Sequence, residues 1–174
     1  MSERVVEMIS EEEVNARIAE IGKAISEEFA GESVFIVCVL RGAVFFATEL
    51  AKRITVPVTL DFIQVSSYGS STVSSGDIKM IRDIDLSTKG RNVIIVEDII
   101  DTGYTLGKLK NLFNQRHAKS VKLCSLLDKP DRREMEVDVD YVGFTVPDKF
   151  IVGYGLDYDQ KYRNLPYVGV VELD

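Results

Sequence analysis

The chain has 174 residues, a hydrophobic content of 45% and a formal net charge of −7. This length and apolar fraction fit one globular domain, whereas the negative charge argues against a general nucleic-acid binder, which needs clustered Lys and Arg. The sequence contains no apolar run long enough to span a bilayer, and the polar start Met-Ser-Glu-Arg does not resemble a signal peptide. We therefore expect a cytoplasmic protein with no nucleic-acid or membrane partner, in which Cys38 and Cys124 are buried and reduced.

The first half of the chain alternates between helix and strand patterns. Ser10 precedes apolar residues that recur at helical spacing as far as Phe29, and Gly31 is a natural helix stop. The continuous apolar run 34–39 predicts a buried strand. The sequence further predicts a helix over 43–54, a strand over 58–65, a polar stretch over 66–76 and a strand over 78–82.

The second half continues this alternation and ends in short β-like pieces. It predicts a buried strand over 93–96, a helix over 105–117, a strand over 121–127, and pieces broken by Pro147, Gly153, Gly155 and Pro166. This order implies an α/β fold with a mainly parallel twisted sheet, helices on both faces and a small appended lobe. We expect one domain over 1–174, with a core over roughly 10–145 and a β-containing hood formed by the N-terminal few residues and 146–174.

The segment Asn92–Leu106 carries the most specific chemical signal. Its strand ends in two adjacent carboxylates, Glu97 and Asp98, and a third, Asp101, opens the turn Thr-Gly-Tyr-Thr before a helix. Carboxylates at the end of a parallel strand line the crevice where open α/β sheets bind ligands. A turn at a helix start offers hydroxyls and free backbone N–H groups to an anion. The segment therefore predicts a site for a phosphorylated sugar with a divalent cation.

This segment resembles the phosphoribosyl-diphosphate (PRPP) signature of the type I phosphoribosyltransferases over residues 96–106. The resemblance implies the fold of that family. It also implies that Glu97 and Asp98 face the ribose hydroxyls and help to hold Mg²⁺, while Asp101 is the general base. The 5′-phosphate would be bound by the turn after them, which consists of Thr102, Gly103, Tyr104 through its backbone amide, and Thr105.

A second phosphate site is suggested where the strand 34–39 ends, at Leu-Arg-Gly-Ala. A guanidinium beside helix N-terminal amides suits a diphosphate, and the resemblance assigns this role to Arg41 and Gly42, with a cis peptide bond at Leu40–Arg41. It also implies that Ser67 and Tyr68 belong to a lid over the diphosphate. Composition alone allows the polar run to be a surface hairpin without that function.

The base pocket is suggested by the C-terminal third. Lys129 follows a buried strand, and the segment 146–157 reads Val-Pro-Asp-Lys-Phe-Ile-Val-Gly-Tyr-Gly-Leu-Asp. A planar heterocycle needs an aromatic face and fixed donors around its edge, although a lone Phe is more often core and a lone Lys solvated. Together these residues resemble the hypoxanthine-guanine phosphoribosyltransferases. The resemblance implies that Lys129 donates to O6, Phe150 stacks, the Ile151 backbone reads the ring edge, Asp157 contacts metal-bound water and the base, and Arg163 contacts diphosphate.

The leading hypothesis is a Mg²⁺-dependent purine salvage enzyme that makes IMP, and GMP as well, from PRPP and a 6-oxopurine, as a homodimer or homotetramer. The sequence leaves open a preference for xanthine, and also a nucleotide-sensing regulator with the same fold. A dinucleotide-binding oxidoreductase would need Gly-x-Gly-x-x-Gly after its first strand, which the chain does not have there. The segment 131–134, Asp-Arg-Arg-Glu, reads as a solvated turn, although relatives use such segments in subunit contacts.

Overall fold

The structure, a computed structural model, describes residues 2–67 and 78–174 and contains two β-sheets. The larger sheet consists of β2 (Val34–Leu40), β3 (Val58–Ser67), β4 (Ile78–Arg82), β5 (Asn92–Ile100), β6 (Ser120–Asp128) and β7 (Tyr141–Thr145). The smaller sheet consists of β1 (Glu3–Ile9), β8 (Ile151–Val152) and β9 (Val168–Leu173). The helices are α1 (Glu11–Glu28), α2 (Val44–Arg53), α3 (Tyr104–Gln115) and the short 3₁₀ helix η1 (Pro130–Arg132).

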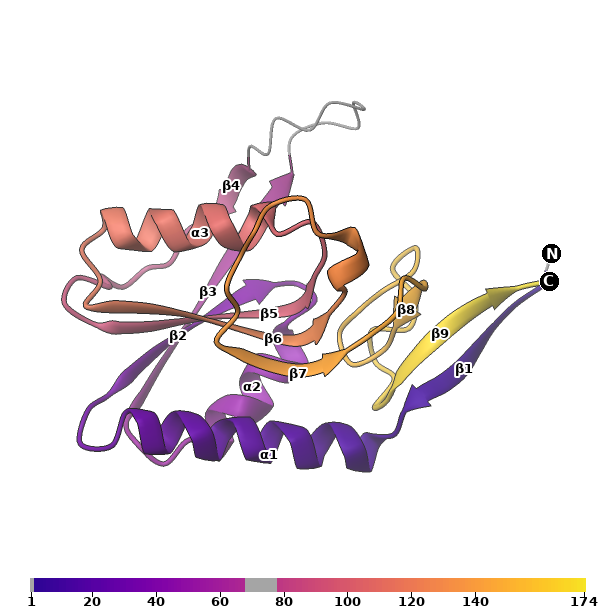
Figure 1. The fold of residues 1–174 in the computed structure, drawn as a ribbon, viewed down its shortest axis with the longest axis horizontal. Helices are drawn as coiled ribbons and strands as arrows, with labels where there is room; N and C mark the ends of the chain where they lie inside the picture. Colours follow the sequence, from indigo (N-terminus) through magenta and orange to yellow (C-terminus); the bar gives the residue numbers. More distant parts are fainter. Residues whose placement is uncertain (1, 68–77) are drawn as a thin grey trace.

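The larger sheet is parallel except for its edge strand β4, and it separates two layers of helices. Its strand order is β4-β3-β2-β5-β6-β7, and β4 alone pairs antiparallel. Helices α1 and α2 pack on one face and α3 on the other (Figure 1), each layer with its own buried core. Phe46 of α2 and Phe113 of α3 are completely buried in these two cores. The α/β architecture with a mainly parallel sheet is therefore confirmed.

The order of the strands places a ligand crevice between β2 and β5. These two strands are neighbours, with Cys38 opposite Val96. From β2 the chain moves outward through α2 to β3, whereas from β5 it moves the opposite way through α3 to β6. The loops that leave the two strands therefore diverge to opposite faces of the sheet. Ligands in open α/β sheets bind at such a switch point, outside the carboxyl ends of the strands.

Strand β5 is longer than the sequence predicted. The pattern placed the strand at 93–96, but pairing with β6 continues to Ile100, which lies opposite Asp128. Glu97 is part of this ladder, opposite Ser125. The backbone of the acidic residues thus remains in the sheet because β6 also extends past its apolar run. The carboxylates are held on a rigid strand rather than on a loop.

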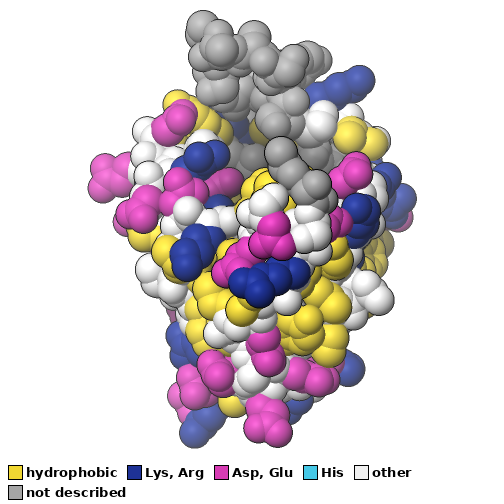
Figure 2. Space-filling view, turned by 90° about the vertical axis from the view of Figure 1, so that its right-hand side faces the viewer, with side chains coloured by type: hydrophobic (Ala, Val, Ile, Leu, Met, Phe, Trp, Pro, Cys, Tyr) yellow, Lys and Arg dark blue, Asp and Glu magenta, His cyan; other side chains and the backbone are white. Residues whose placement is uncertain are grey.

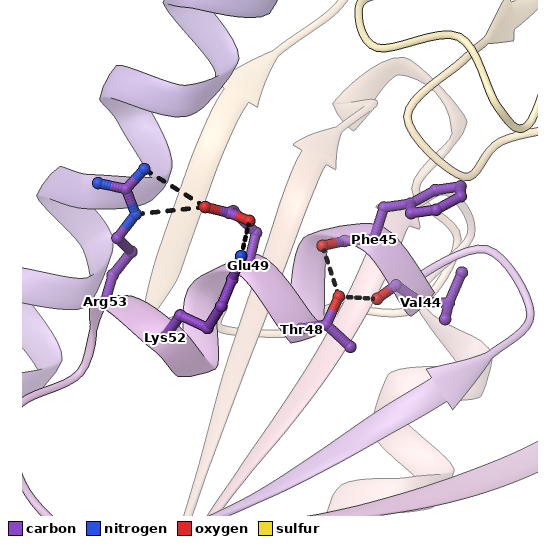
Figure 3. A network of polar contacts seen from close by, with 6 residues as sticks. All are labelled: Val44, Phe45, Thr48, Glu49, Lys52 and Arg53. Atoms are coloured by element: carbon purple, nitrogen blue, oxygen red, sulfur yellow. Dashed lines mark hydrogen bonds and ion pairs between the residues drawn. The ribbon is translucent and has the colours of Figure 1, made fainter.

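Polar contacts run along the exposed side of α2 (Figure 3). The Thr48 hydroxyl donates to the carbonyl of Val44 at 2.7 Å. Further along, Glu49 forms ion pairs with Lys52 at 2.8 Å and Arg53 at 3.3 Å. These contacts join successive turns of the helix that follows the Arg-Gly loop after β2.

The smaller sheet forms a hood beyond the carboxyl edge of the larger one (Figure 1). It brings the two ends of the chain together, because β1 pairs with β9 and β9 with β8, all antiparallel. Glu3 on β1 accepts hydrogen bonds from Lys161 at 2.8 Å and from the Tyr162 hydroxyl at 2.7 Å. These bonds tie the loop between β8 and β9 to the N-terminal strand.

Within the described residues, no helix is both long and apolar enough to cross a membrane.

Candidate active site

The turn between β5 and α3 encloses a small cavity of about 200 Å³. Gly103 caps α3 with φ of 92°, a left-handed conformation that favours glycine. A Cβ there would also lie only 2.6 Å from the Met135 carbonyl oxygen, so glycine is required on two counts. The cavity is lined by Glu97, Ile99, Ile100, Asp101, Thr102, Gly103, Thr105 and Leu106. The predicted sugar-phosphate residues are thus gathered in one place, apart from Asp98 and Tyr104.

The paired acids are electrostatically crowded. Burial raises the pKa of Glu97 well above its ordinary value, and the neighbouring charge of Asp98 raises it further. Burial also raises the pKa of Asp98, although the hydrogen bond with Glu97 and the positive charge of Arg163 oppose this effect. Their oxygens accept backbone hydrogen bonds, from Asp98 N to Glu97 at 3.1 Å and from Ile99 N to Asp98 at 2.7 Å. Because ionising both is costly, a bound cation or hydroxyl donors would be favoured here.

Asp101 connects this small cavity to a larger one. It lines both cavities, and its buried Oδ1 has no hydrogen-bond partner among the described residues. A buried polar atom without a partner is costly unless a ligand or water serves it. The carboxylate is therefore available to a substrate, as a general base must be.

The larger cavity, of about 510 Å³, brings the predicted base-pocket residues together with two of the acids. Lys129, Phe150, Ile151 and Asp157 all line it. Asp98 and Asp101 lie on its sheet side, at the end of β5. The rest of its lining is Ile99, Arg132, Asp148, Lys149 and Leu156, of which the polar residues were not predicted to belong to the site.

Lys129 and Phe150 are placed against the usual tendencies of their residue types. The Lys129 side chain is only 11% exposed, and its Nζ donates to the Lys149 carbonyl at 2.9 Å and lies 3.8 Å from Asp148 Oδ1. Phe150 is 56% exposed and meets Tyr158 edge to face, with ring centroids 4.9 Å apart. A solvated Lys and a core Phe are thus both ruled out. The arrangement leaves an ammonium inside the cavity and an aromatic ring at its rim.

The loop after β2 lies directly against the end of β5. The peptide bond Leu40–Arg41 is cis, as predicted. A Cβ on Gly42 would lie 1.8 Å from Asp98 Oδ2, so this residue must be glycine for the loop to come so close. From the other side, a Cβ on Gly155 would lie 2.0 Å from the Gly42 carbonyl oxygen. Three segments far apart in the sequence therefore meet around Gly42.

Arg163 lies on the hood side of this meeting point. Its guanidinium donates to the Gly155 carbonyl at 2.7 Å and lies 3.3 Å from the Asp157 carboxylate. Arg41 is exposed on the opposite loop. The two arginines predicted for diphosphate thus flank Gly42, one on each of the loops that meet there.

For three predicted residues the structure does not show a side chain that lines either cavity. Tyr68 lies outside the described residues, and Ser67 ends β3 in register with Ile78, so their part in a lid stays a prediction. Tyr104 begins α3 but lines neither cavity, in keeping with a backbone role alone.

The predicted metal ligands do not form a closed site. Glu97 lines the small cavity, whereas Asp98 and Asp157 line the large one. Over residues 2–67 and 78–174, no group of three or more His, Cys, Asp or Glu side chains is arranged to hold a metal ion by itself. Magnesium is usually held by one or two carboxylates together with waters and substrate phosphates, so this donor set suits a cation that arrives with a phosphorylated substrate.

The surface at the hood end carries charged side chains of both signs (Figure 2). Lys, Arg, Asp and Glu side chains intermix there above a group of exposed hydrophobic side chains. No wide basic face of the kind that binds nucleic-acid backbones is seen in this view.

Comparison with known proteins agrees with this geometry. The family model described as "Phosphoribosyl transferase domain" matches residues 6–159. The hypoxanthine phosphoribosyltransferase of Salmonella typhimurium is 47% identical over 99% of this chain and 98% of its own length. The hypoxanthine-guanine phosphoribosyltransferase of Streptococcus thermophilus is 50% identical over 95% of this chain and 92% of its own length. A bifunctional protein of Listeria monocytogenes, TilS/HprT, is 51% identical, but the chain spans only 26% of its length.

Solved structures give the same answer. A hypoxanthine-guanine phosphoribosyltransferase of Bacillus anthracis superposes with a TM-score of 0.92 at 46% identity, over 95% of this chain and 97% of that one. A hypoxanthine phosphoribosyltransferase of Staphylococcus aureus gives a TM-score of 0.93 at 38% identity, over 96% and 91%. The chain therefore belongs to the phosphoribosyltransferase family, in the group of the hypoxanthine and hypoxanthine-guanine enzymes.

Proposed function

We propose that the protein transfers the phosphoribosyl group of PRPP to hypoxanthine, and also to guanine, and releases diphosphate. One observation carries this proposal. The acids of the sugar site, Asp98 and Asp101, line the same cavity as Lys129 and Phe150 of the base pocket. The anomeric carbon and the purine would therefore meet inside one hollow, as the reaction requires.

The small cavity would hold the sugar phosphate. Its turn offers the hydroxyls of Thr102 and Thr105 and the amides that precede α3 to a 5′-phosphate, at the positive end of the helix. Glu97 and Asp98 would accept hydrogen bonds from the ribose hydroxyls. This placement of the sugar phosphate would put the anomeric carbon at the boundary of the two cavities, next to Asp101.

The large cavity would hold the purine. Phe150 stacks on the ring, Lys129 donates to the exocyclic O6, and the backbone at Ile151 reads the ring edge. Adenine has an amino group where Lys129 needs an acceptor, so it is disfavoured. Xanthine has an oxo group at the same position, so Lys129 excludes xanthine less strongly than adenine.

In the reaction, a purine ring nitrogen forms a bond to the anomeric carbon while the bond from that carbon to the diphosphate oxygen breaks. Asp101 accepts the proton that the purine loses. Arg41 and Arg163 stabilise the negative charge of the departing diphosphate, and Ser67 and Tyr68 would cover it against water.

A magnesium ion would be held by Glu97, Asp98 and Asp157 together with substrate oxygens, and it would neutralise charge on the diphosphate. Asp101 Oδ1, which has no hydrogen-bond partner in the part of the chain that the structure describes, favours an enzyme over a nucleotide-sensing regulator, since a regulator has no use for a base at that point. We also expect a homodimer or homotetramer, as in many soluble proteins of this kind.

Initial-rate measurements with PRPP, Mg²⁺ and each of adenine, guanine, hypoxanthine and xanthine test the proposal. We expect nucleotide formation with hypoxanthine and guanine, loss of activity with EDTA, and little activity with adenine. Turnover of adenine alone would overturn the assignment of the base pocket. The absence of turnover with every base would overturn the proposed function.

A further inference from the structure

Arg133 lies in the segment 131–134, which the sequence suggested to be a solvated turn. The structure corrects this for Arg133. Its side chain is 21% exposed, forms an ion pair with Oδ1 of Asp128 at the end of β6, and donates from Nε to the Asp101 carbonyl at 3.1 Å. The neighbouring Arg132 is 56% exposed and lies 3.8 Å from Asp148 instead. The two adjacent arginines therefore have different roles.

The contact from Arg133 is one of several between its segment and the turn after β5. The carbonyl of Ile100 accepts from Lys129 N at 3.0 Å. The carbonyl of Thr102 accepts from Glu134 N at 3.0 Å and from Met135 N at 2.9 Å. With the Arg133 bond to Asp101, three consecutive carbonyls, from the last residue of β5 into the turn, are held by the segment 129–135. Of these donors, Arg133 alone is a side chain.

Holding these carbonyls also orients the amides of the turn. In a trans peptide the C=O and the following N–H point in opposite directions. When the carbonyl of Asp101 is held toward Arg133, the N–H of Thr102 is directed away from it. Likewise, the carbonyl of Thr102 is held toward Glu134 and Met135, so the N–H of Gly103 is directed away from them. Both Thr102 and Gly103 line the small cavity, so the hydrogen bonds from the segment 129–135 determine where their N–H groups point.

We propose that Arg133 is a positioning residue for the phosphate-binding turn and for Asp101. Arg133 lines neither of the two cavities. The effect of this role on catalysis rests on the proposed function. The planar guanidinium serves two acceptors at once, the Asp128 carboxylate and the Asp101 carbonyl. A lysine ammonium is a point charge without this fixed fork. The ion pair with Asp128 fixes the guanidinium, and the guanidinium fixes the turn.

The test compares Arg133→Met and Arg133→Lys with a matched control. Arg116→Gln removes an arginine that also pairs with an aspartate, Asp83, at 2.6 Å, but at the opposite end of α3 from the turn and outside both site cavities. We expect Arg133→Met to raise the KM for PRPP about tenfold or more, because misdirected amides lose charge-assisted hydrogen bonds to phosphate. The KM for hypoxanthine should stay within about twofold of the wild-type value. The KM for PRPP of Arg133→Lys should fall between those of the wild type and Arg133→Met.

A double variant separates positioning from stability. Arg133→Met leaves the Asp128 carboxylate without its partner, which by itself destabilises the fold. Adding Asp128→Asn removes that unpaired charge, so the melting temperature should recover while the KM for PRPP stays high. A KM for PRPP that recovers together with the melting temperature would reduce Arg133 to a structural role and overturn the proposal.

Amide hydrogen exchange of residues 101–105 gives a readout that does not depend on turnover. Arg133→Met should increase exchange there, and Arg116→Gln should not. Wild-type protein without activity toward any base would contradict the proposed function. The exchange result would still show whether Arg133 holds the turn in place. Active wild-type protein with an unchanged KM for PRPP and unchanged exchange in Arg133→Met would contradict the positioning role.

Discussion

A single methyl group added at Gly42 should disable the site without unfolding the protein. Gly42 does not have the positive φ that disfavours other residues, so alanine meets no left-handed strain there. The new Cβ would lie 1.8 Å from Asp98 Oδ2, whereas real Cβ contacts are essentially never shorter than 3.0 Å. Either the Asp98 carboxylate or the loop must therefore move by at least the difference, 1.2 Å.

The surroundings limit where this movement can go. The loop cannot easily retreat toward the hood, because the Gly42 carbonyl oxygen would be 2.0 Å from a Cβ at Gly155 and is already packed closely there. Asp98 sits on β5 with its Oδ1 bonded to Ile99 N at 2.7 Å. A misplacement of about 1 Å in a catalytic site can cost about 10²-fold in rate, which corresponds to about 2.7 kcal/mol in the barrier. We expect Gly42→Ala to lower kcat/KM for PRPP by about that factor.

The assay follows IMP formation against PRPP concentration at saturating hypoxanthine and Mg²⁺, together with the melting temperature. Gly31→Ala serves as the control, since Gly31 has φ of +81° and no described atom within 4 Å of the added Cβ. That change should cost about 1–2 kcal/mol of stability through left-handed strain and leave kcat/KM unchanged. A Gly42→Ala enzyme within twofold of wild type in kcat/KM would refute the inferred contact between this loop and Asp98.

Three further outcomes are expected. Asp101→Asn should lower kcat by about 10²-fold if this carboxylate accepts the purine proton, and near wild-type turnover would remove that role. Cys38 should resist alkylation by iodoacetamide in the native protein at neutral pH, because burial, together with Glu97 and Asp98, raises its pKa to about 12; rapid native labelling would contradict this. Arg116→Gln should destabilise the fold by less than about 1 kcal/mol at neutral pH, since the pair with Asp83 is about one-third exposed. Arg116 lowers the pKa of Asp83, so this stabilisation is present above the ordinary value of 3.8 and is lost as the pH falls through the folded value. Urea unfolding near pH 2 should therefore show no difference from wild type, and an equal loss at both pH values would contradict the assignment.

The sequence predicted the sheet because its central strands are continuous apolar runs. Such runs are buried on both faces in a parallel sheet, and the helices between them show apolar residues at helical spacing. The extent of β5 was missed because Glu97 and Asp98 do not look like strand residues, although Glu97 and Ile99, on either side of Asp98, pair with β6. Sheet pairing with a distant strand overrides such local preferences.

The acids of the sugar site, the loop at Arg41 and Lys129 could be predicted together because they lie at the ends of strands that share one edge of the sheet. The roles of the residues in the hood were implied by the resemblance instead. The environment of each side chain could not be predicted. Nothing near Arg133 in the sequence distinguishes it from Arg132, since its partner carbonyl at Asp101 is 32 positions away. The burial of Lys129 depends likewise on the carbonyl of Lys149, which arrives from another segment of the chain.

The sugar-phosphate site is tested most directly by titration of the wild-type protein with PRPP by calorimetry, with Mg²⁺ present and no base added. If the acids and amides at the carboxyl end of β5 form the sugar-phosphate site, PRPP should bind saturably with one site per chain, and binding should weaken when Mg²⁺ is removed. PRPP that does not bind, or that binds equally well to the Gly42→Ala variant, would contradict the placement of the sugar-phosphate site at the carboxyl end of β5.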